Sequence, residues 1–366
     1  MADRFNKVSD SFVCQYCLSK SKLDKIQFRS TNEHLKEIPD NKKIQFWNDL
    51  LKRNPSFVLP PAFSPRIRNF GLQTIHNKAG QSVPVAYVDE GKYCTDTRLC
   101  PICHNDLPEN IGFVNTANII VIGDDSQRSL NFVNNMFNSL SKECSIESVA
   151  FYVSNQKEWK HINQSGFDCD VSYLCGKIVL FSAKGKTVLE VTVTYYPLGF
   201  NEIEYISESQ MSKFLINSDG IIFVSDYDNL FCDEESNSCL EQYLFKIKDI
   251  LGMSAHDNSA IPVAIVFSGI EKLKNKSEVN IPNIDISYHF DSEISNNITV
   301  NILEDTNNRI LQNFRAVFSN SFFSSVPNNP KNCESNDLVY QNPIKWIFQT
   351  NNYISSKQNS SEKESK

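Results

Sequence analysis

The sequence predicts an α/β protein in which helices flank a mostly parallel sheet, with a separate module at the N-terminus. Three unbroken apolar runs predict the sheet: NIIVIG (118–123), DGIIFVSD (219–226) and IPVAIVFSG (261–269). Strands that are covered on both faces have such runs, rather than an alternating pattern. Segments with apolar residues at helical spacing lie between the runs, as expected for parallel strands joined by crossover helices.

The N-terminal region, residues 1–113, shows little alternation of strands and helices. Two cysteine pairs bracket most of it: CQYC (14–17) and CPIC (100–103). One helix is predicted inside the region, in DNKKIQFWNDLLKRN (40–54), where apolar residues recur at helical spacing. Asp40 is suited to cap the start of this helix, because its side-chain oxygen can accept a backbone hydrogen bond.

The second region, residues 114–350, alternates strands and helices. Besides the three runs, we predict a helix from Ser129, a strand over 148–154, an antiparallel hairpin over 177–199 that adds an edge strand, and helices over 240–252, 302–318 and 339–348. The polar tail 351–366 is predicted to be disordered. The predicted domains are therefore 1–113, 114–350 and the tail 351–366.

Composition and charge narrow the classes of partner. The 366 residues are 40% hydrophobic and carry a net charge of -7, with no long block of Lys or Arg. An acidic protein has no general attraction for nucleic acid or anionic lipid, so nucleic-acid binding is disfavoured. No signal peptide is evident, and no apolar run approaches the roughly 20 residues that span a bilayer. We therefore expect a cytoplasmic protein without membrane contact.

The cysteines indicate a metal site. In a reducing compartment, paired cysteines at short spacing are more typical of metal ligands than of disulfides. Two Cys-x-x-Cys pairs can supply four thiolates to a tetrahedral structural zinc, and the predicted ligands are Cys14, Cys17, Cys100 and Cys103. The gap from Cys17 to Cys100 is long for such a site, but the cost of loop closure grows only logarithmically with length. Cys94 and His104 are alternative ligands, and two unrelated pairs of reduced thiols are the alternative without metal.

The segment after the first apolar run has the layout of a phosphate-binding loop. Such a loop reads Gly-x-x-x-x-Gly-Lys-Ser/Thr, with the Lys and the hydroxyl contacting phosphate and magnesium. Here Gly123 begins the loop, Arg128 stands at the Lys position and Ser129 at the hydroxyl position, and the loop is one residue short. Two acidic residues, Asp124 and Asp125, lie where an anion would approach and would repel it.

Further along the chain, each later nucleotide-binding motif has a counterpart, and each is altered. In the GTPase order, a hairpin leads into Asp-x-x-Gly; here Gly199 is present, but Tyr196 occupies the Asp position. The base-reading motif Asn/Thr-Lys-x-Asp is replaced by a segment with Gly269 at the Lys and Glu271 at the Asp. A last loop, at Ser324–Val326, stands where Ser-Ala-Lys is expected.

Taken in order, these motifs resemble the double-GTPase type-two family of the TRAFAC clade, a family of prokaryotic GTPase-like proteins with an N-terminal zinc ribbon. The resemblance covers about residues 12–349 and rests on CQYCLSKSKLDKIQFRS, RLCPICHNDLP, NIIVIGDDSQRS, SDGIIFVSDYDNL and NPIKWIF. It implies a TRAFAC GTPase-like fold, bound zinc, GTP or a related nucleotide, and membership of multi-gene prokaryotic systems associated with conflict with phage. The altered Lys, Asp and base-reading positions weaken the case for GTP, for magnesium and for catalysis.

The interpretation that we favour is a pseudo-GTPase that acts as a scaffold or regulator and holds a structural zinc. Its vestigial nucleotide site comprises Gly123, Arg128, Ser129, Gly199 and Glu271, and no catalytic residue is assigned. Its expected partners are proteins, namely a related GTPase or an effector of the same system. The alternative is a P-loop protein that binds or hydrolyses GTP through an unconventional loop, with Arg128 as the phosphate cation.

Overall fold

The computed structural model describes most of both predicted regions. The described residues are 10–14, 16–51, 56–64, 71–89, 91–123, 126–142, 151–154, 174–181, 187–196, 217–227, 261–269, 296–297, 299–304, 311–312, 314–315, 320–326 and 336–351. The chain forms two compact units: Met1–Asn118 with Tyr152–Thr194 and Glu202–Ser218, and Ile119–Phe151 with Tyr195–Asn201 and Asp219–Lys366.

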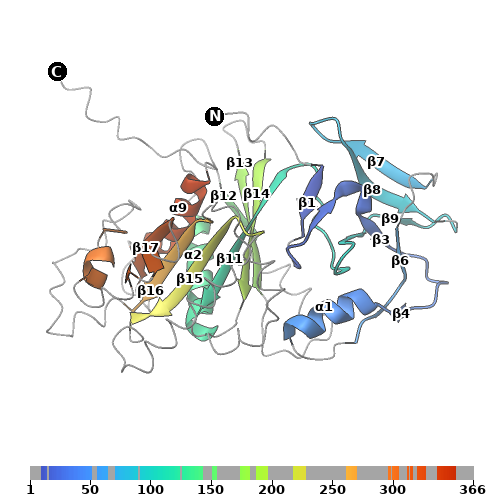
Figure 1. The fold of residues 1–366 in the computed structure, drawn as a ribbon. Helices are drawn as coiled ribbons and strands as arrows, with labels where there is room; N and C mark the ends of the chain where they lie inside the picture. Colours follow the sequence, from blue (N-terminus) through green and yellow to red (C-terminus); the bar gives the residue numbers. More distant parts are fainter. Residues whose placement is uncertain are drawn as a thin grey trace, which may run out of the picture. The chain divides into compact units, whose positions relative to one another are not determined.

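The N-terminal region consists mainly of short antiparallel strands (Figure 1). Their sheets are β1 (Ser11–Val13) with β2 (Lys20–Lys22); β10 (Arg98–Leu99), β3 (Gln27–Arg29) and β6 (Ala62–Phe63); β4 (Ile38–Pro39) with β5 (Val58–Leu59); and β7 (Leu72–His76), β8 (Ser82–Val88) and β9 (Cys94–Thr95). A 3-10 turn, η1 (Leu23–Lys25), follows β2. Helix α1 (Asn41–Leu51) begins after Asp40, whose Oδ1 accepts a hydrogen bond from the Lys43 N–H at 3.2 Å, which confirms the predicted cap.

A small buried cluster includes residues of β1, β3 and β8. Its members are the four cysteines of the predicted metal site together with Phe12, Leu23, Ile26, Phe28, Val83, Tyr87, Leu107 and Ile111. Strands of two to seven residues bury little apolar area, so packing alone stabilises such a region weakly. Small modules of this kind usually have an additional source of stability, such as a bound metal.

Arg98 fixes the segment that follows the second cysteine pair. Its buried guanidinium donates to the carbonyl oxygens of Ile111 at 3.0 Å, Pro84 at 3.4 Å and Pro108 at 2.7 Å, and to that of Glu109. Burial lowers the pKa of Arg98, yet an arginine side chain stays charged in proteins. The carbonyl dipoles therefore satisfy a buried charge and hold three backbone segments together.

The second region contains the predicted sheet. Its strands are β11 (Asn115–Gly123), β12 (Phe151–Ser154), β13 (Leu174–Phe181), β14 (Thr187–Tyr196), β15 (Gly220–Asp226), β16 (Val263–Ser268) and β17 (Ser321–Val326), in the order β12-β13-β14-β11-β15-β16-β17. β11, β15, β16 and β17 pair in parallel, and every residue of β15 and β16 is buried. The hairpin was expected to supply the edge strand, but this expectation was wrong, because β12 lies beyond β13 in the order.

Helices pack on this sheet. α2 (Ser126–Lys142) and α9 (Asn342–Thr350) both contact β15, and Figure 1 shows them beside the strands. The 3-10 turn η5 (Asn336–Gln341) connects them: the Tyr340 ring lies 6.0 Å from the Phe132 ring, and Gln341 donates to Ser139 Oγ at 2.8 Å. The predicted α/β class, with helices flanking a mostly parallel sheet, is confirmed.

Other predictions are met in part or lie outside the description. Part of the predicted 302–318 helix is helical, at residues 302–304, 311–312 and 314–315. The predicted helix at 240–252 lies outside the described residues, as does nearly all of the tail. No helix within the described ranges combines the length and the apolar character that crossing a membrane requires.

Candidate metal centre and the carboxyl edge of the sheet

The two cysteine pairs meet in one buried cluster. The sulfur atoms of Cys14, Cys17, Cys100 and Cys103 all lie within 4.8 Å of one another. The Cys14 and Cys103 sulfurs are 3.8 Å apart, and those of Cys17 and Cys100 are 3.7 Å apart. Zinc bound tetrahedrally by thiolates, with bonds of about 2.3 Å, requires sulfur–sulfur distances of about 3.8 Å. The spacing therefore fits a metal ion such as zinc.

The backbone forms the same turn at both pairs. The Leu18 N–H donates to the Cys14 carbonyl at 2.8 Å, and the His104 N–H donates to the Cys100 carbonyl at 3.0 Å. Leu18 and His104 each follow the second cysteine of a pair, and their φ angles are +47° and +54°. Residues other than glycine rarely adopt this left-handed conformation.

Backbone N–H groups also point at the first sulfur of each turn. The Tyr16 N–H donates to Cys14 Sγ and the Ile102 N–H donates to Cys100 Sγ, both at 3.4 Å. Such hydrogen bonds stabilise thiolates, the form in which cysteine binds metal. The two turns are thus equivalent knuckles, although they lie far apart in the sequence.

The pKa values of the four thiols differ for physical reasons. Burial raises the pKa of Cys14 and of Cys103. The hydrogen bond from Cys100 lowers the pKa of Cys17, and the hydrogen bond from Cys103 lowers that of Cys100. Four negative thiolates repel one another in a buried space, so full deprotonation requires a cation among them. The donor set therefore suits a soft or borderline divalent metal such as zinc.

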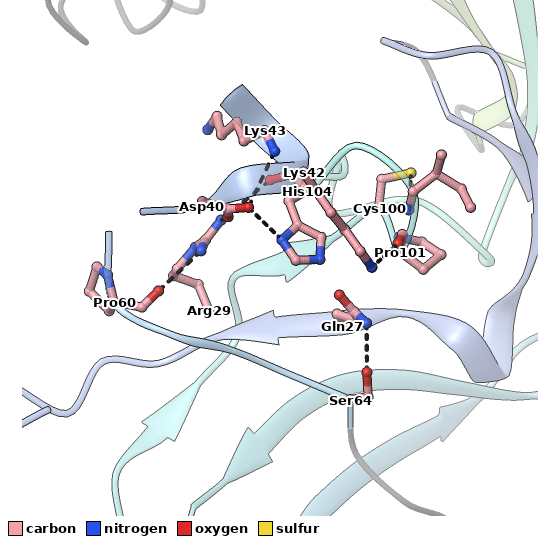
Figure 2. Close-up of polar contacts among 11 residues, drawn as sticks. Gln27, Arg29, Asp40, Lys42, Lys43, Pro60, Ser64, Cys100, Pro101 and His104 are labelled. Atoms are coloured by element: carbon pink, nitrogen blue, oxygen red, sulfur yellow. Dashed lines mark hydrogen bonds and ion pairs between the residues drawn. The ribbon is translucent and has the colours of Figure 1, made fainter. Parts of the chain in front are cut away.

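The alternative ligands lie outside this group. Cys94 is exposed and is not a member of the cluster. His104 points its Nδ1 atom at the Asp40 carboxylate, 2.8 Å from Oδ1, as Figure 2 shows. The other carboxylate oxygen, Oδ2, is 2.7 Å from Arg29 Nη2. Burial would raise the pKa of Asp40, but the hydrogen bonds from His104 and Arg29 outweigh it and hold this pKa well below its usual value.

The Arg29–Asp40–His104 group was not predicted from the sequence as a unit. Only 11%, 4% and 12% of these side chains are exposed, in the same order. The sequence identified Asp40 as a helix cap and His104 as a possible ligand, but nothing in it linked the two residues. Only the fold brings their segments together.

At the carboxyl edge of the sheet, the described residues of the predicted nucleotide site are placed differently than expected. β11 ends at Gly123 as predicted, but α2 already begins at Ser126, three residues before the expected start. Arg128 and Ser129 therefore lie in the first turn of α2 rather than at the end of a loop. The sequence Asp-Asp-Ser favours a helix N-terminus, which accounts for the early start. Gly199 and Glu271 lie outside the described residues.

At the base-reading position, Ser268 and Gly269 are hydrogen-bonded to neighbouring strands. Ser268 Oγ donates to the Ser225 carbonyl at 3.3 Å, and the Gly269 N–H donates to the Val326 carbonyl at 2.8 Å. Gly269 has a φ angle of +85°, a conformation that favours glycine and strains a lysine. Both residues are buried.

The expected last loop is instead part of a strand. Ser324, Ser325 and Val326 belong to β17 and are buried, so the loop expected there was wrong. Ser325 Oγ lies 2.5 Å from the Tyr227 hydroxyl and 2.8 Å from Thr299 Oγ1. The two serines interrupt the apolar pattern that reveals a strand, and internal hydrogen bonds make the burial of Ser325 possible. No sequence signal marked Tyr227 as a member of this network.

Comparisons with known proteins add little to this geometry. Neither a protein-family model nor a curated protein matches the sequence. Among solved structures, the chain is similar to the "LeoA bacterial dynamin GTPase from ETEC", at 10% sequence identity and a TM-score of 0.28. The match covers 64% of this chain and 38% of that protein's chain. A similarity at this score carries no argument about fold or function.

Proposed function

We propose that this protein is a pseudo-GTPase with a structural zinc, acting as a scaffold or regulator. The observation that carries the proposal is the link between β11 and α2. Only two residues, Asp124 and Asp125, separate Gly123 from the first residue of α2. A phosphate loop has about five residues between its first Gly and its Lys, and their backbone N–H groups surround the phosphates. Here four residues lie between Gly123 and Arg128, the last two of them already belong to α2, and the two carboxylates of Asp124 and Asp125 repel an anion.

The internal bonds of the other motifs support the same proposal. The hydroxyl groups of Ser268 and Ser325 form hydrogen bonds with other residues of the same chain, and the Gly269 N–H is bonded to β17. A nucleotide would have to compete with these buried bonds. Loss of base-reading hydrogen bonds to charged groups weakens binding by about 1.5–3 kcal/mol each.

The order of elements supports a GTPase-like origin. A strand followed by a helix comes first, then a hairpin, then three parallel strands and a terminal helix. This is the chain order that the resemblance to the TRAFAC family implied. Ligands of such sheets bind at the carboxyl ends of the strands, and Gly123 and Ser268 are the last residues of β11 and β16.

The proposed partners are proteins, namely a related GTPase or an effector of the same multi-gene prokaryotic system. This part rests on the family resemblance and on the loss of the nucleotide motifs. A domain without its own chemistry contributes surfaces for assembly. The net charge of -7 further disfavours nucleic acid as the partner.

Calorimetry with GTP, GDP and ATP in the presence of magnesium tests the nucleotide proposal. We expect no binding at 100 µM nucleotide, while an active GTPase measured in parallel gives the usual heat. A phosphate-release assay should show no turnover above buffer. Micromolar affinity and turnover that both disappear in Ser129→Ala and Arg128→Ala would instead establish the alternative, a GTPase with an unconventional loop.

Metal analysis of the purified protein tests the zinc. We expect about one zinc per chain, because four thiolates complete one tetrahedral site. Cys100→Ser should lose most of it, whereas Cys94→Ser, at an exposed cysteine outside the cluster, should retain it. A folded protein that purifies from zinc-supplemented medium without metal would rule the site out.

A further inference from the structure

We propose that metal bound by the four cysteines fixes helix α1 in place, and that His104 and Asp40 transmit this effect. The inference rests on the metal site proposed above. It assigns a positioning role to two residues that are not metal ligands. The result would be a helix whose order reports whether the metal is bound.

The first link joins the metal site to the His104 side chain. His104 directly follows Cys103, and its N–H donates to the Cys100 carbonyl at 3.0 Å. Its left-handed φ of +54° belongs to the knuckle turn rather than to a regular element. The direction of the imidazole therefore depends on the shape of the knuckle, which metal–sulfur bonds at two cysteines would hold.

The second link joins His104 to the start of α1. Asp40 Oδ1 accepts the Lys43 N–H at 3.2 Å as the helix cap, and it also lies 2.8 Å from His104 Nδ1. The Asp40 carbonyl accepts the first helical bond, from Ile44 N at 2.9 Å. Arg29, from β3, holds the other carboxylate oxygen at 2.7 Å. One buried carboxylate thus serves the helix cap and the knuckle together (Figure 2).

Helix α1 is short and has contacts besides its cap. The helix has 11 residues, and isolated helices shorter than about 12–15 residues are marginally stable in water. None of its described side chains is fully buried, but Phe46 is half-buried and packs against the cysteine cluster, and Lys43 Nζ lies 5.2 Å from the centre of the Phe57 ring. Lys42 Nζ reaches the Pro101 carbonyl at 2.7 Å, but this contact is exposed. The cap adds to these contacts at the start of a helix that is marginally stable on its own.

Thermodynamic linkage makes the proposal quantitative. If metal binding favours the docked helix, the docked helix must favour metal binding by the same factor. The hydrogen bond between His104 and Asp40, like others of its kind, typically shifts an equilibrium about fivefold. Removing the His104 side chain should therefore increase opening of α1 and weaken metal affinity by a similar factor of about five.

Hydrogen exchange followed by mass spectrometry tests this in the zinc-loaded full chain and after chelation. His104→Gly is the informative variant, because it removes the imidazole, keeps all four cysteines and suits a positive φ. Lys92→Gly is the matched control, because Lys92 is exposed and also has a positive φ, +65°. Lys42→Ala removes only the exposed contact.

We expect amides 43–51 to exchange faster after zinc removal in the wild-type protein. In zinc-loaded His104→Gly they should exchange about five times faster than in the wild type, with zinc still bound and β7–β8 amides unchanged. Competition with a chromophoric chelator should show about fivefold weaker zinc binding. Lys92→Gly and Lys42→Ala should change each quantity less than twofold.

Two results would overturn the inference while leaving the metal site intact: unchanged α1 exchange in zinc-loaded His104→Gly, or unchanged α1 exchange on removing zinc from the wild type. A similar gain in exchange in Lys92→Gly would also overturn it, because the backbone and not the imidazole would then be responsible. A wild-type protein that binds no zinc would overturn both this inference and the metal site.

Discussion

The polar network at the end of β17 gives a sharp prediction about what the altered nucleotide motifs now do. Ser325 Oγ is bonded to the Tyr227 hydroxyl and to Thr299 Oγ1, and all three residues are buried. Tyr227→Phe removes one hydrogen bond while Ser325 keeps Thr299, so the expected loss of stability is about 1 kcal/mol. Ser325→Ala leaves two buried hydroxyls without this partner, so its expected loss is about 2–3 kcal/mol.

The stability of the double variant tests whether these hydroxyl groups form one internal hydrogen-bond network. When Tyr227 is already Phe, Ser325→Ala no longer leaves a buried phenol without its hydrogen-bond partner. The double variant should therefore lose about 1 kcal/mol less stability than the sum of the two single variants. Hydrogen exchange of the β15–β17 amides in water measures these free energies in the unit concerned. Tyr93→Phe, at a partly exposed tyrosine outside this network, should leave them unchanged to within about 0.5 kcal/mol.

The same network predicts a dependence on alkaline pH. Burial raises the pKa of Tyr227 well above its usual value, despite the opposing hydrogen bond to Ser325. A raised folded-state pKa means that the contribution to stability is complete below about pH 10 and is lost as the pH rises further, because the unfolded state then ionises first. The advantage of the wild type over Tyr227→Phe should shrink by up to about 1.4 kcal/mol per pH unit above pH 10. Stability losses of the two single variants that simply add in the double variant would refute the network. A Ser325→Ala variant as stable as the Tyr93→Phe control would also refute it.

The remaining predictions concern separate parts of the fold. Arg98→Lys should destabilise the N-terminal region by about 2 kcal/mol, because one ammonium cannot reach all the carbonyls that the guanidinium contacts; hydrogen exchange of β8 and β10 measures this. Gly220→Ala should cost about 1–3 kcal/mol, seen in β15 exchange, because the added Cβ would lie 2.6 Å from Ile347 Cγ2. Gly269→Lys should cost about 1 kcal/mol from its positive φ and should give no GTP binding in calorimetry.

The apolar strands of the sheet were the most predictable part of this protein. The runs at 118–123, 219–226 and 261–269 correspond to β11, β15 and β16. Each is buried on both faces, so its composition alone marks it. β17 escaped the pattern, because the buried Ser324 and Ser325 interrupt its apolar run, and the hydrogen bonds of Ser325 form only in the folded chain.

The metal centre was predictable for a different reason. Ligand type and Cys-x-x-Cys spacing are local properties of the sequence, so both knuckles could be found before their meeting was known. What the sequence could not provide was the contact between Asp40 and His104, which depends on how β3, α1 and the second knuckle assemble. The predicted start of α2 was also wrong, because the prediction followed the pattern of a phosphate loop and not the local preference of Asp-Asp-Ser for a helix start.

The parallel sheet can persist without nucleotide because its stability and its edge chemistry reside in different residues. β15 and β16 are buried along their whole lengths, whereas Asp124 and Asp125 lie in the sequence between β11 and α2. Changes in such a link therefore alter ligand binding while the sheet keeps its packing. In β16 and β17, the hydroxyl groups of Ser268 and Ser325 form internal hydrogen bonds, whereas a nucleotide-binding edge would need such groups free to bind the ligand. Under the pseudo-GTPase proposal, such internal bonds take the place of an opening for nucleotide at this edge of the sheet.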